Sequence, residues 1–139
     1  MKSIPEIDVY VRFCETDAAG HVSNTSYFLY LEEARTKFFE AIGFGRDNRK
    51  RLNLNFIIAS TQCNFLAQAY AYQTLTLTTT VSRIGTKSFT MEHIIKTADS
   101  NLIVATGSAV VVCFNFHKQQ SELIPSELRS VLEQCLMPA

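Results

Sequence analysis

Residues 17–35 read DAAGHVSNTSYFLYLEEAR, and this stretch decides the fold. It opens as a loop, because residues 15–21 are rich in turn-forming residues. It continues as a helix over about residues 24–42, where apolar side chains recur at spacings of three and four: Tyr27, Leu31, Ala34, Phe38 and Ile42. Asn24 or Thr25 is expected to cap the helix and Gly43 to end it. Further apolar residues widen the stripe, so other elements should surround this helix on several sides.

Most of the remaining chain is predicted to be strand. Residues 6–14 alternate, with four apolar side chains on one face: Ile7, Val9, Val11 and Phe13. Four more strands are expected over residues 54–66, 74–84, 87–97 and 102–116, and a short helix over about 126–136 with Ser126 as its cap. Strands joined by tight turns form an antiparallel sheet, against which the long helix must pack. The prediction is one α+β domain spanning residues 1–139.

Composition excludes several classes of function. Thirteen basic and thirteen acidic residues cancel, which argues against nucleic-acid binding and against an anionic membrane surface. The longest apolar run, residues 109–114, is too short to cross a bilayer. Residues 1–6 contain no hydrophobic core of signal-peptide length. Four widely spaced cysteines form no CxxC pair, so we expect reduced structural thiols, no metal site and a cytoplasmic protein: Cys14, Cys63, Cys113 and Cys135.

Asp17 is the first candidate for chemistry. It follows a predicted strand and lies seven residues before the expected helix cap. An aspartate in a Thr-Asp-Ala-Ala-Gly loop can simply form a turn. Alternatively, the strand end and the helix N-terminus face each other across a cleft, where unpaired amides of residues 22–25 could stabilise a developing negative charge beside the carboxylate.

The stretch resembles the signature of the hot-dog-fold acyl-CoA thioesterases, specifically the 4-hydroxybenzoyl-CoA thioesterase-like family. That pattern is Asp, two residues, Gly, one residue, Val, four residues, Tyr, and then a helix with Glu-x-x-Arg. The resemblance continues through residues 83–89 to the last helix, and so covers nearly the whole chain. The sequence departs from the family pattern in two places. Residues 66–68 are Leu-Ala-Gln where many relatives have Leu-Arg-Pro, and residues 72–73 are Tyr-Gln where many relatives have an acidic residue. The fold implied is a five-stranded antiparallel sheet wrapped around a long central helix.

The resemblance also implies the chemistry. Asp17 would attack the thioester carbon of an acyl-CoA or acyl-carrier-protein substrate, or activate water, while the backbone amide near Asn24 holds the carbonyl oxygen. A thiol leaving group, with a pKa near 8.5, departs without strong acid catalysis. No cofactor is expected, since coenzyme A is part of the substrate. The residues expected to bind substrate are Gly20, His21, Val22, Tyr27, Ser60, Arg83, Lys87 and Ser88.

Other polar residues have two interpretations each. His21 could bind substrate or pack against a second subunit, whereas His93 and His117 are interpreted as structural. Glu32 could be a second carboxylate of the site, since some hot-dog branches use a helix glutamate, but with Asp17 already in the loop it is expected to pair with Arg35. Glu33 is expected to pair with Lys37. Residues 46–51 (RDNRKR) contain four cations. They form either a solvated loop or a contact for phosphates of coenzyme A or of a pantetheine arm.

Two rival functions remain open at this level. A hot-dog hydratase or dehydratase would use a close Asp/His pair, which Asp17 and His21 could imitate. A non-catalytic acyl-CoA binding protein would retain its ligand without turnover. The edge strand of such a sheet needs covering, so we expect a homodimer joined edge to edge and doubled to a tetramer.

Overall fold

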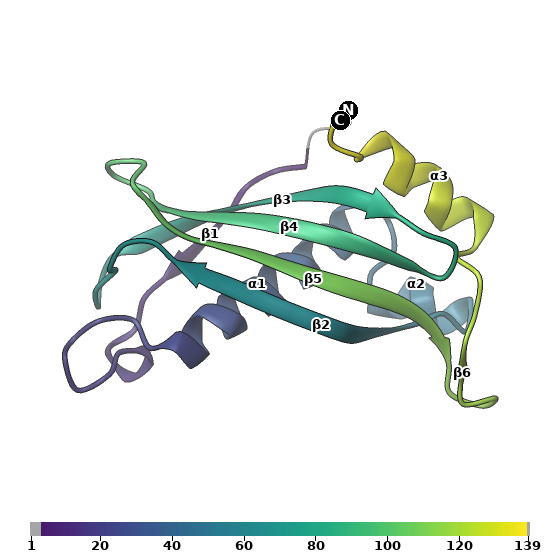
Figure 1. Cartoon of the computed structure of the whole chain (residues 1–139), viewed down its shortest axis with the longest axis horizontal. Coiled ribbons are helices and arrows are strands. Elements are labelled where there is room, and N and C mark those ends of the chain that lie inside the picture. The colour runs from purple at the N-terminus through teal and green to yellow at the C-terminus, as the bar shows by residue number, and fades with distance from the viewer. Residues whose placement is uncertain (1–3, 139) are drawn as a thin grey trace.

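The computed structural model describes residues 4–138, so residues 1–3 and 139 of the predicted domain lie outside the described residues. The chain forms β1 (Ile7–Tyr10), the 3₁₀ helix η1 (Phe13–Glu15), α1 (Asn24–Ala41), α2 (Arg46–Arg51), β2 (Asn55–Phe65), β3 (Thr74–Ile84), β4 (Ser88–Thr97), β5 (Ile103–Asn115), β6 (Gln120–Ser121) and α3 (Ser126–Gln134). Figure 1 shows the long strands as one curved sheet with α1 lying across its far side.

The sheet has the order β1-β3-β4-β5-β2, and every pairing along it is antiparallel. The two-residue β6 adds only a short hairpin to the end of β5. Buried side chains alternate with more exposed ones along β4, as expected for a strand with one face on the core. In β3 the apolar residues Leu75, Leu77 and Val81 are buried, and Thr76 is buried as well, with its hydroxyl donating to Asp8. The α+β class and the five-stranded hot-dog architecture are therefore confirmed.

Helix α1 packs closely on the middle of the sheet. Its five predicted core residues are each at most 6% exposed: Tyr27, Leu31, Ala34, Phe38 and Ile42. Under the centre of the helix lies Gly107 of β5, where an added Cβ would come within 2.7 Å of Leu31 Cδ1. Glycine at this position lets helix and sheet approach each other. Gly43 ends the helix with a left-handed φ of +85°, which confirms the predicted stop.

Two predictions near the N-terminus were wrong. The strand ends at Tyr10, and the chain then turns into η1. This turn takes Phe13 off the buried face, leaving it 71% exposed, and it also exposes Cys14. The cap of α1 is Ser23, not Asn24 or Thr25, because the Ser23 hydroxyl accepts a hydrogen bond from the Ser26 amide.

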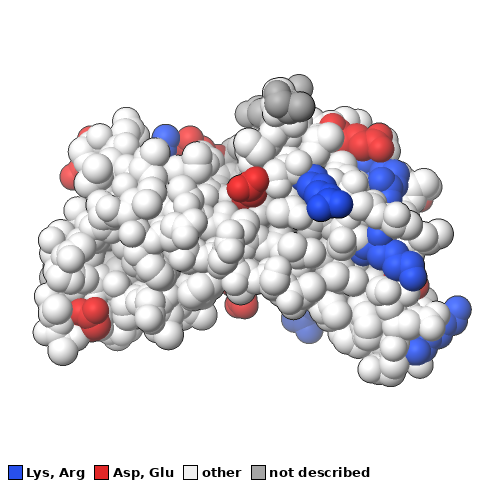
Figure 2. Space-filling model, viewed as in Figure 1, with Lys and Arg blue, Asp and Glu red and all other residues white. Residues whose placement is uncertain are grey.

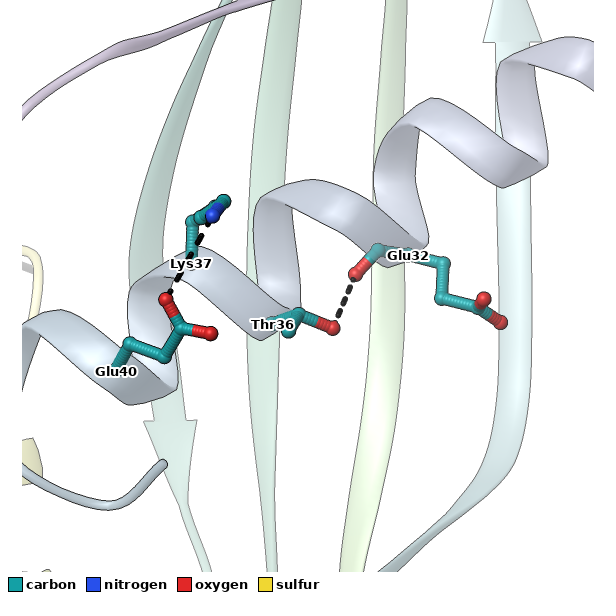
Figure 3. Close-up of polar contacts among 4 residues, drawn as sticks. All are labelled: Glu32, Thr36, Lys37 and Glu40. Carbon is teal, nitrogen blue, oxygen red and sulfur yellow. Dashed lines mark hydrogen bonds and ion pairs between the residues drawn. The ribbon is translucent and has the colours of Figure 1, made fainter. Parts of the chain in front are cut away.

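The exposed side of α1 also differs from the expected pairing. Lys37 pairs with Glu40, at 3.7 Å, in place of Glu33. Figure 3 shows this pair together with the Thr36 hydroxyl donating to the backbone oxygen of Glu32. Within residues 4–138, Glu32 forms no ion pair with Arg35. Arg35 is buried, and burial lowers its pKa although the charge of Glu32 opposes that shift.

Two corrections concern the shorter helices. Residues 46–51 form α2 and are not an irregular loop, and Asn48 supports the helix by donating to the backbone oxygen of Gly43. Ser126 is the first residue of α3 and does not cap it. Pro125 occupies the N-cap position with a φ of −58° and a ψ of 145°, and it forms no capping hydrogen bond because its side chain carries no acceptor.

Candidate active site

The loop between η1 and α1 folds back on itself. Thr16 bridges to Val22, and the Asp17 amide donates to the His21 backbone oxygen at 2.8 Å. The turn is closed by the Gly20 amide, which donates to the Asp17 backbone oxygen at 3.0 Å. Gly20 has a φ of +86°, which a residue with a side chain rarely adopts. The local sequence thus fixes the position of Asp17 relative to the start of α1.

The two oxygens of the Asp17 carboxylate have different surroundings. Oδ1 accepts hydrogen bonds from the Ala19 amide at 2.9 Å and the His21 amide at 3.4 Å. Oδ2 accepts none from any residue the structure describes. One carboxylate oxygen therefore stabilises the turn, as the first interpretation predicts, while the other is left without a hydrogen-bond donor from the described residues.

The first turn of α1 supplies hydrogen-bond donors at the same place. Ser23 caps the helix, and Ser26 is tied to the loop because its hydroxyl donates to the backbone oxygen of Glu15 at 2.9 Å. The amides of Asn24 and Thr25 have no acceptor among residues 4–138, as is usual for the first turn of a helix. These donors and the positive end of the helix dipole favour an oxyanion.

A cleft of about 350 Å³ joins the carboxylate to these amides, and its lining comes from the loop, α1 and the end of β2: Asp17, His21, Val22, Ser23, Asn24, Tyr27, Phe65, Ala67 and Gln68. Tyr27 and Phe65 form its aromatic wall, with ring centroids 5.3 Å apart. Burial raises the pKa of Tyr27, so its hydroxyl stays protonated. The cleft combines an apolar wall with a few convergent polar groups, as small-molecule sites usually do.

The imidazole of His21 is oriented by an aromatic contact. It lies edge-on to Tyr70, with ring centroids 5.2 Å apart. Its backbone, and not its ring, contacts the Asp17 carboxylate. Within the described chain the two side chains form no hydrogen bond, so the geometry does not support an Asp/His dyad.

The structure brings together only part of the expected binding set. His21, Val22 and Tyr27 line the cleft with Asp17 and Asn24, and Gly20 shapes the loop. Ser60 lies in the middle of β2, opposite Val110. The three hairpin residues lie at the β3–β4 turn, which Figure 1 shows at the opposite end of the sheet from the start of α1: Arg83, Lys87 and Ser88.

Sequence reasoning missed other residues of the cleft. It considered residues 66–68 only as a departure from the family pattern, yet Ala67 and Gln68 line the cleft with Phe65. Ser23 was missed as the cap, although it directly precedes the first helical residue and carries a capping hydroxyl. Among residues 4–138, no cluster of three His, Cys, Asp or Glu side chains could hold a metal ion, and no helix is long and apolar enough to span a membrane.

The remaining two histidines occupy opposite environments. His93 is 2% exposed, and its Nδ1 lies 2.9 Å from the Thr79 hydroxyl. Burial, and secondly the charge of Arg35, lower the pKa of His93 to about 4. His117 is exposed in the turn after β5. Neither lies in the cleft.

Comparison with known proteins identifies the family. The thioesterase-like superfamily matches residues 11–132. The chain belongs to this superfamily. Its hot-dog resemblance is thereby confirmed, and membership supports the expected enzyme class, a thioester hydrolase.

Individual relatives agree with this assignment. The long-chain acyl-CoA thioesterase FadM of Escherichia coli is 26% identical over 93% of this chain and 97% of its own length. YsmA of Bacillus subtilis is 34% identical, but the matched segment spans 62% of this chain and only 56% of YsmA. The structure of BH1999, a gentisyl-coenzyme A thioesterase, is 26% identical with a TM-score of 0.82, and the match covers 92% of this chain and 99% of that one.

Proposed function

We propose that the protein hydrolyses acyl-CoA thioesters to a free acid and coenzyme A. The observation that carries this proposal is the free Oδ2 of Asp17 in one cleft with Asn24, whose amide is unpaired, as is that of the next residue, Thr25. Together these groups supply a carboxylate and an oxyanion site, which is sufficient for a bond with a good leaving group. FadM and BH1999 support coenzyme A as the thiol carrier.

Two routes satisfy this geometry. In the first, Oδ2 attacks the thioester carbon, the thiolate leaves, and water hydrolyses the resulting mixed anhydride. In the second, Oδ2 takes a proton from water as the water oxygen attacks, and the tetrahedral intermediate then expels the thiolate. In both routes the amides of Asn24 and Thr25 hold the carbonyl oxygen as it becomes negative.

A single-turnover reaction in ¹⁸O-labelled water tests the covalent route. If Asp17 attacks and water then hydrolyses the anhydride at Cγ of Asp17, the first molecule of product keeps a carboxylate oxygen of the enzyme and contains no label from solvent. Direct attack by water places the label in the first product, as does hydrolysis of the anhydride at the acyl carbon, so an unlabelled first product identifies attack by Asp17. Mass spectrometry of the acid formed reads the difference.

The substitution Asp17→Asn tests the proposal. The asparagine oxygen can still accept the Ala19 and His21 amides, so the loop should persist, while the nucleophilic oxygen and the charge are lost. We expect thiol release to fall by about a hundredfold to ten-thousandfold with binding retained. His21→Ala is the matched control in the same cleft and should lose far less.

The outcomes separate the candidate functions. Near-full activity in Asp17→Asn would refute the mechanism, and an equally inactive His21→Ala would favour the Asp/His dyad. A change in enoyl absorbance without thiol release would indicate a hydratase, whereas tight acyl-CoA retention without turnover would indicate a binding protein. A panel of long-chain and aryl acyl-CoA substrates, with the same acyl groups on carrier protein, would define the acyl preference.

We also propose that the protein is a homodimer joined through β2, doubled to a tetramer. β2 is an edge strand of eleven residues, NFIIASTQCNF, without a charge or a proline to prevent pairing. Antiparallel pairing of β2 with the β2 strand of a second copy gives a dimer with closed twofold symmetry. Sedimentation should show no monomer at micromolar concentration, and a monomer there would refute the assembly.

A further inference from the structure

Glu15 connects the two halves of the candidate active site. It is the last residue of η1, and one residue separates it from Asp17. Its backbone oxygen accepts hydrogen bonds from the Ser23 amide at 3.0 Å and from the Ser26 hydroxyl at 2.9 Å. Ser23 directly precedes Asn24, whose amide is one of the expected oxyanion donors. The backbone of Glu15 therefore links the segment that carries the carboxylate to the segment that carries the amides.

The Glu15 side chain is held by two neutral donors. Its Oε1 accepts hydrogen bonds from the Tyr30 hydroxyl at 2.8 Å and from the Arg12 amide at 2.9 Å. Tyr30 lies one helical turn after Ser26 on α1, so both hydroxyls lie on the side of the helix that faces η1. Burial, and secondly the hydrogen bond to Glu15, raises the pKa of Tyr30, so its hydroxyl stays protonated and can donate. We name Glu15, Ser26 and Tyr30 the Glu15 network.

Ion pairs do not hold this part of the described chain together. The two ion pairs within residues 4–138 join Lys37 to Glu40 and Lys96 to Glu6. On the face shown in Figure 2, most of the Lys and Arg surface lies at the end that carries α2, α3 and β6 in Figure 1, away from the start of α1. Hydrogen bonds therefore hold the loop before α1 in place.

The Glu15 network lies outside the cleft that would hold the substrate. None of its three members is among the described residues that line the Asp17 cleft. Tyr30 is 3% exposed and Ser26 is 4% exposed, so water does not compete strongly with these hydroxyls for the oxygens of Glu15. Any effect of the network on catalysis must therefore pass through the loop that carries Asp17.

We propose that the residues of the Glu15 network are positioning residues for the reaction, because they hold the Asp17 carboxylate in its place relative to the first-turn amides of α1. This inference rests on the proposed function. Loss of either hydroxyl would let η1 move relative to α1. A misplacement of about 1 Å between reacting groups costs roughly a hundredfold in rate. The residues that line the cleft would be unchanged, so substrate binding should persist.

Removal of single hydroxyls tests this role. Tyr30→Phe keeps the aromatic ring in the core, and Ser26→Ala removes the side-chain donor to the backbone oxygen of Glu15. We expect each variant to lower kcat for acyl-CoA hydrolysis by about tenfold to a hundredfold, with KM unchanged. The matched control is Thr76→Val, which removes a buried hydroxyl that donates to the Asp8 carboxylate at 3.0 Å, in the β1–β3 pair. It should leave kcat unchanged, whatever its effect on the thermal midpoint.

Two substitutions of Glu15 separate hydrogen bonding from charge. Glu15→Gln keeps a side-chain oxygen that can accept the Tyr30 hydroxyl and the Arg12 amide, so it should retain most of kcat. Glu15→Ala has no such acceptor and should lose kcat as Tyr30→Phe does. The double variant Glu15→Ala/Tyr30→Phe should be no slower than Glu15→Ala, because both changes remove the same hydrogen bond. If Glu15→Gln is as slow as Glu15→Ala, the hydrogen bond is not the cause.

Hydrogen exchange gives a measurement that does not depend on activity. The Ser23 amide donates to the backbone oxygen of Glu15, so its exchange reports on the contact between η1 and α1. Tyr30→Phe and Ser26→Ala should speed exchange of this amide, while the amides of β4 exchange as before. Thr76→Val should leave the Ser23 amide unchanged. Faster exchange in β4 to the same extent would indicate a loss of stability throughout the fold and would overturn the positioning role.

The kinetic outcomes separate the possible failures. No thiol release by the unsubstituted protein would refute the proposed function, and the positioning role with it. Thiol release with normal kcat in both Tyr30→Phe and Ser26→Ala would overturn only the positioning role. A raised KM with normal kcat would also overturn it, because the network would then act on binding. If one of the two variants does not fold, as judged by circular dichroism, the kcat of the other decides.

Discussion

His93 should make the folded state lose stability in mild acid. Its ring lies on the inner face of β4, and its Nε2 has no hydrogen-bond partner within residues 4–138. Burial, followed by the charge of Arg35, lowers its pKa from 6.5 to about 4. A proton added to the folded ring would place a second buried charge near Arg35. Between about pH 4 and pH 6.5, the His93 imidazole is therefore neutral in the folded protein but protonated in the unfolded chain.

The magnitude follows from the two pKa values. Because the folded value is the lower one, the unfolded state binds more protons between them, and stability is lost as the pH falls from about 6.5 toward 4. Each pH unit in this window is worth about 1.36 kcal/mol. At about pH 5 the loss from His93 alone is therefore about 2 kcal/mol relative to neutral pH.

Urea unfolding at about pH 7.5 and pH 5 measures this effect. The carboxylates titrate alike in every variant, so His93 is isolated by comparing the pH dependence of the original protein with that of His93→Gln and His93→Leu. Both variants should lose about 2 kcal/mol less between the two pH values, whatever their stability at neutral pH. The control His117→Gln removes an exposed imidazole and should behave like the original protein. If His93→Gln loses as much stability as the original, the ring is not held neutral and the reasoning fails.

Three further predictions concern packing, capping and the thiols. Gly107→Ala should lower the unfolding free energy by about 1–3 kcal/mol, because the added Cβ would overlap Leu31 Cδ1. Leu31→Ala removes the overlapping atom, so the double variant should lose less stability than the two single variants added together. Simple additivity would contradict the overlap. Ser23→Ala should lower the thermal midpoint, at a cost of about 1 kcal/mol, and an unchanged midpoint would mean that the cap contributes nothing. In the folded protein a disulfide reagent should modify exposed Cys14 but not Cys113, whose pKa burial raises to about 12, and early modification of Cys113 by mass spectrometry would argue against that burial.

Local patterns were enough to predict most of the elements. The spacing of apolar residues from Tyr27 to Ile42 predicts α1, and the alternation over residues 74–84 matches β3 at both ends. The stop at Gly43 was also predictable, because a left-handed φ favours glycine wherever it occurs. The error at the helix cap arises because local patterns do not describe the path of the chain. Whether Ser23 or Asn24 caps the helix depends on the path of the preceding loop, which the spacing of apolar residues does not reveal.

The sequence by itself determined the motif loop, the helix that follows it and the positions of the strands along the chain, because these depend on residues within a few positions of one another. Only the tertiary structure decided which residues meet. β2 pairs with β5, and this brings Phe65 and Ala67 to a cleft whose carboxylate lies about fifty residues earlier in the chain. The same curl of the sheet buries His93 near Arg35 and leaves β2 as an unprotected edge. Strand order and register are long-range properties, set by the whole core at once and not by any one stretch of sequence.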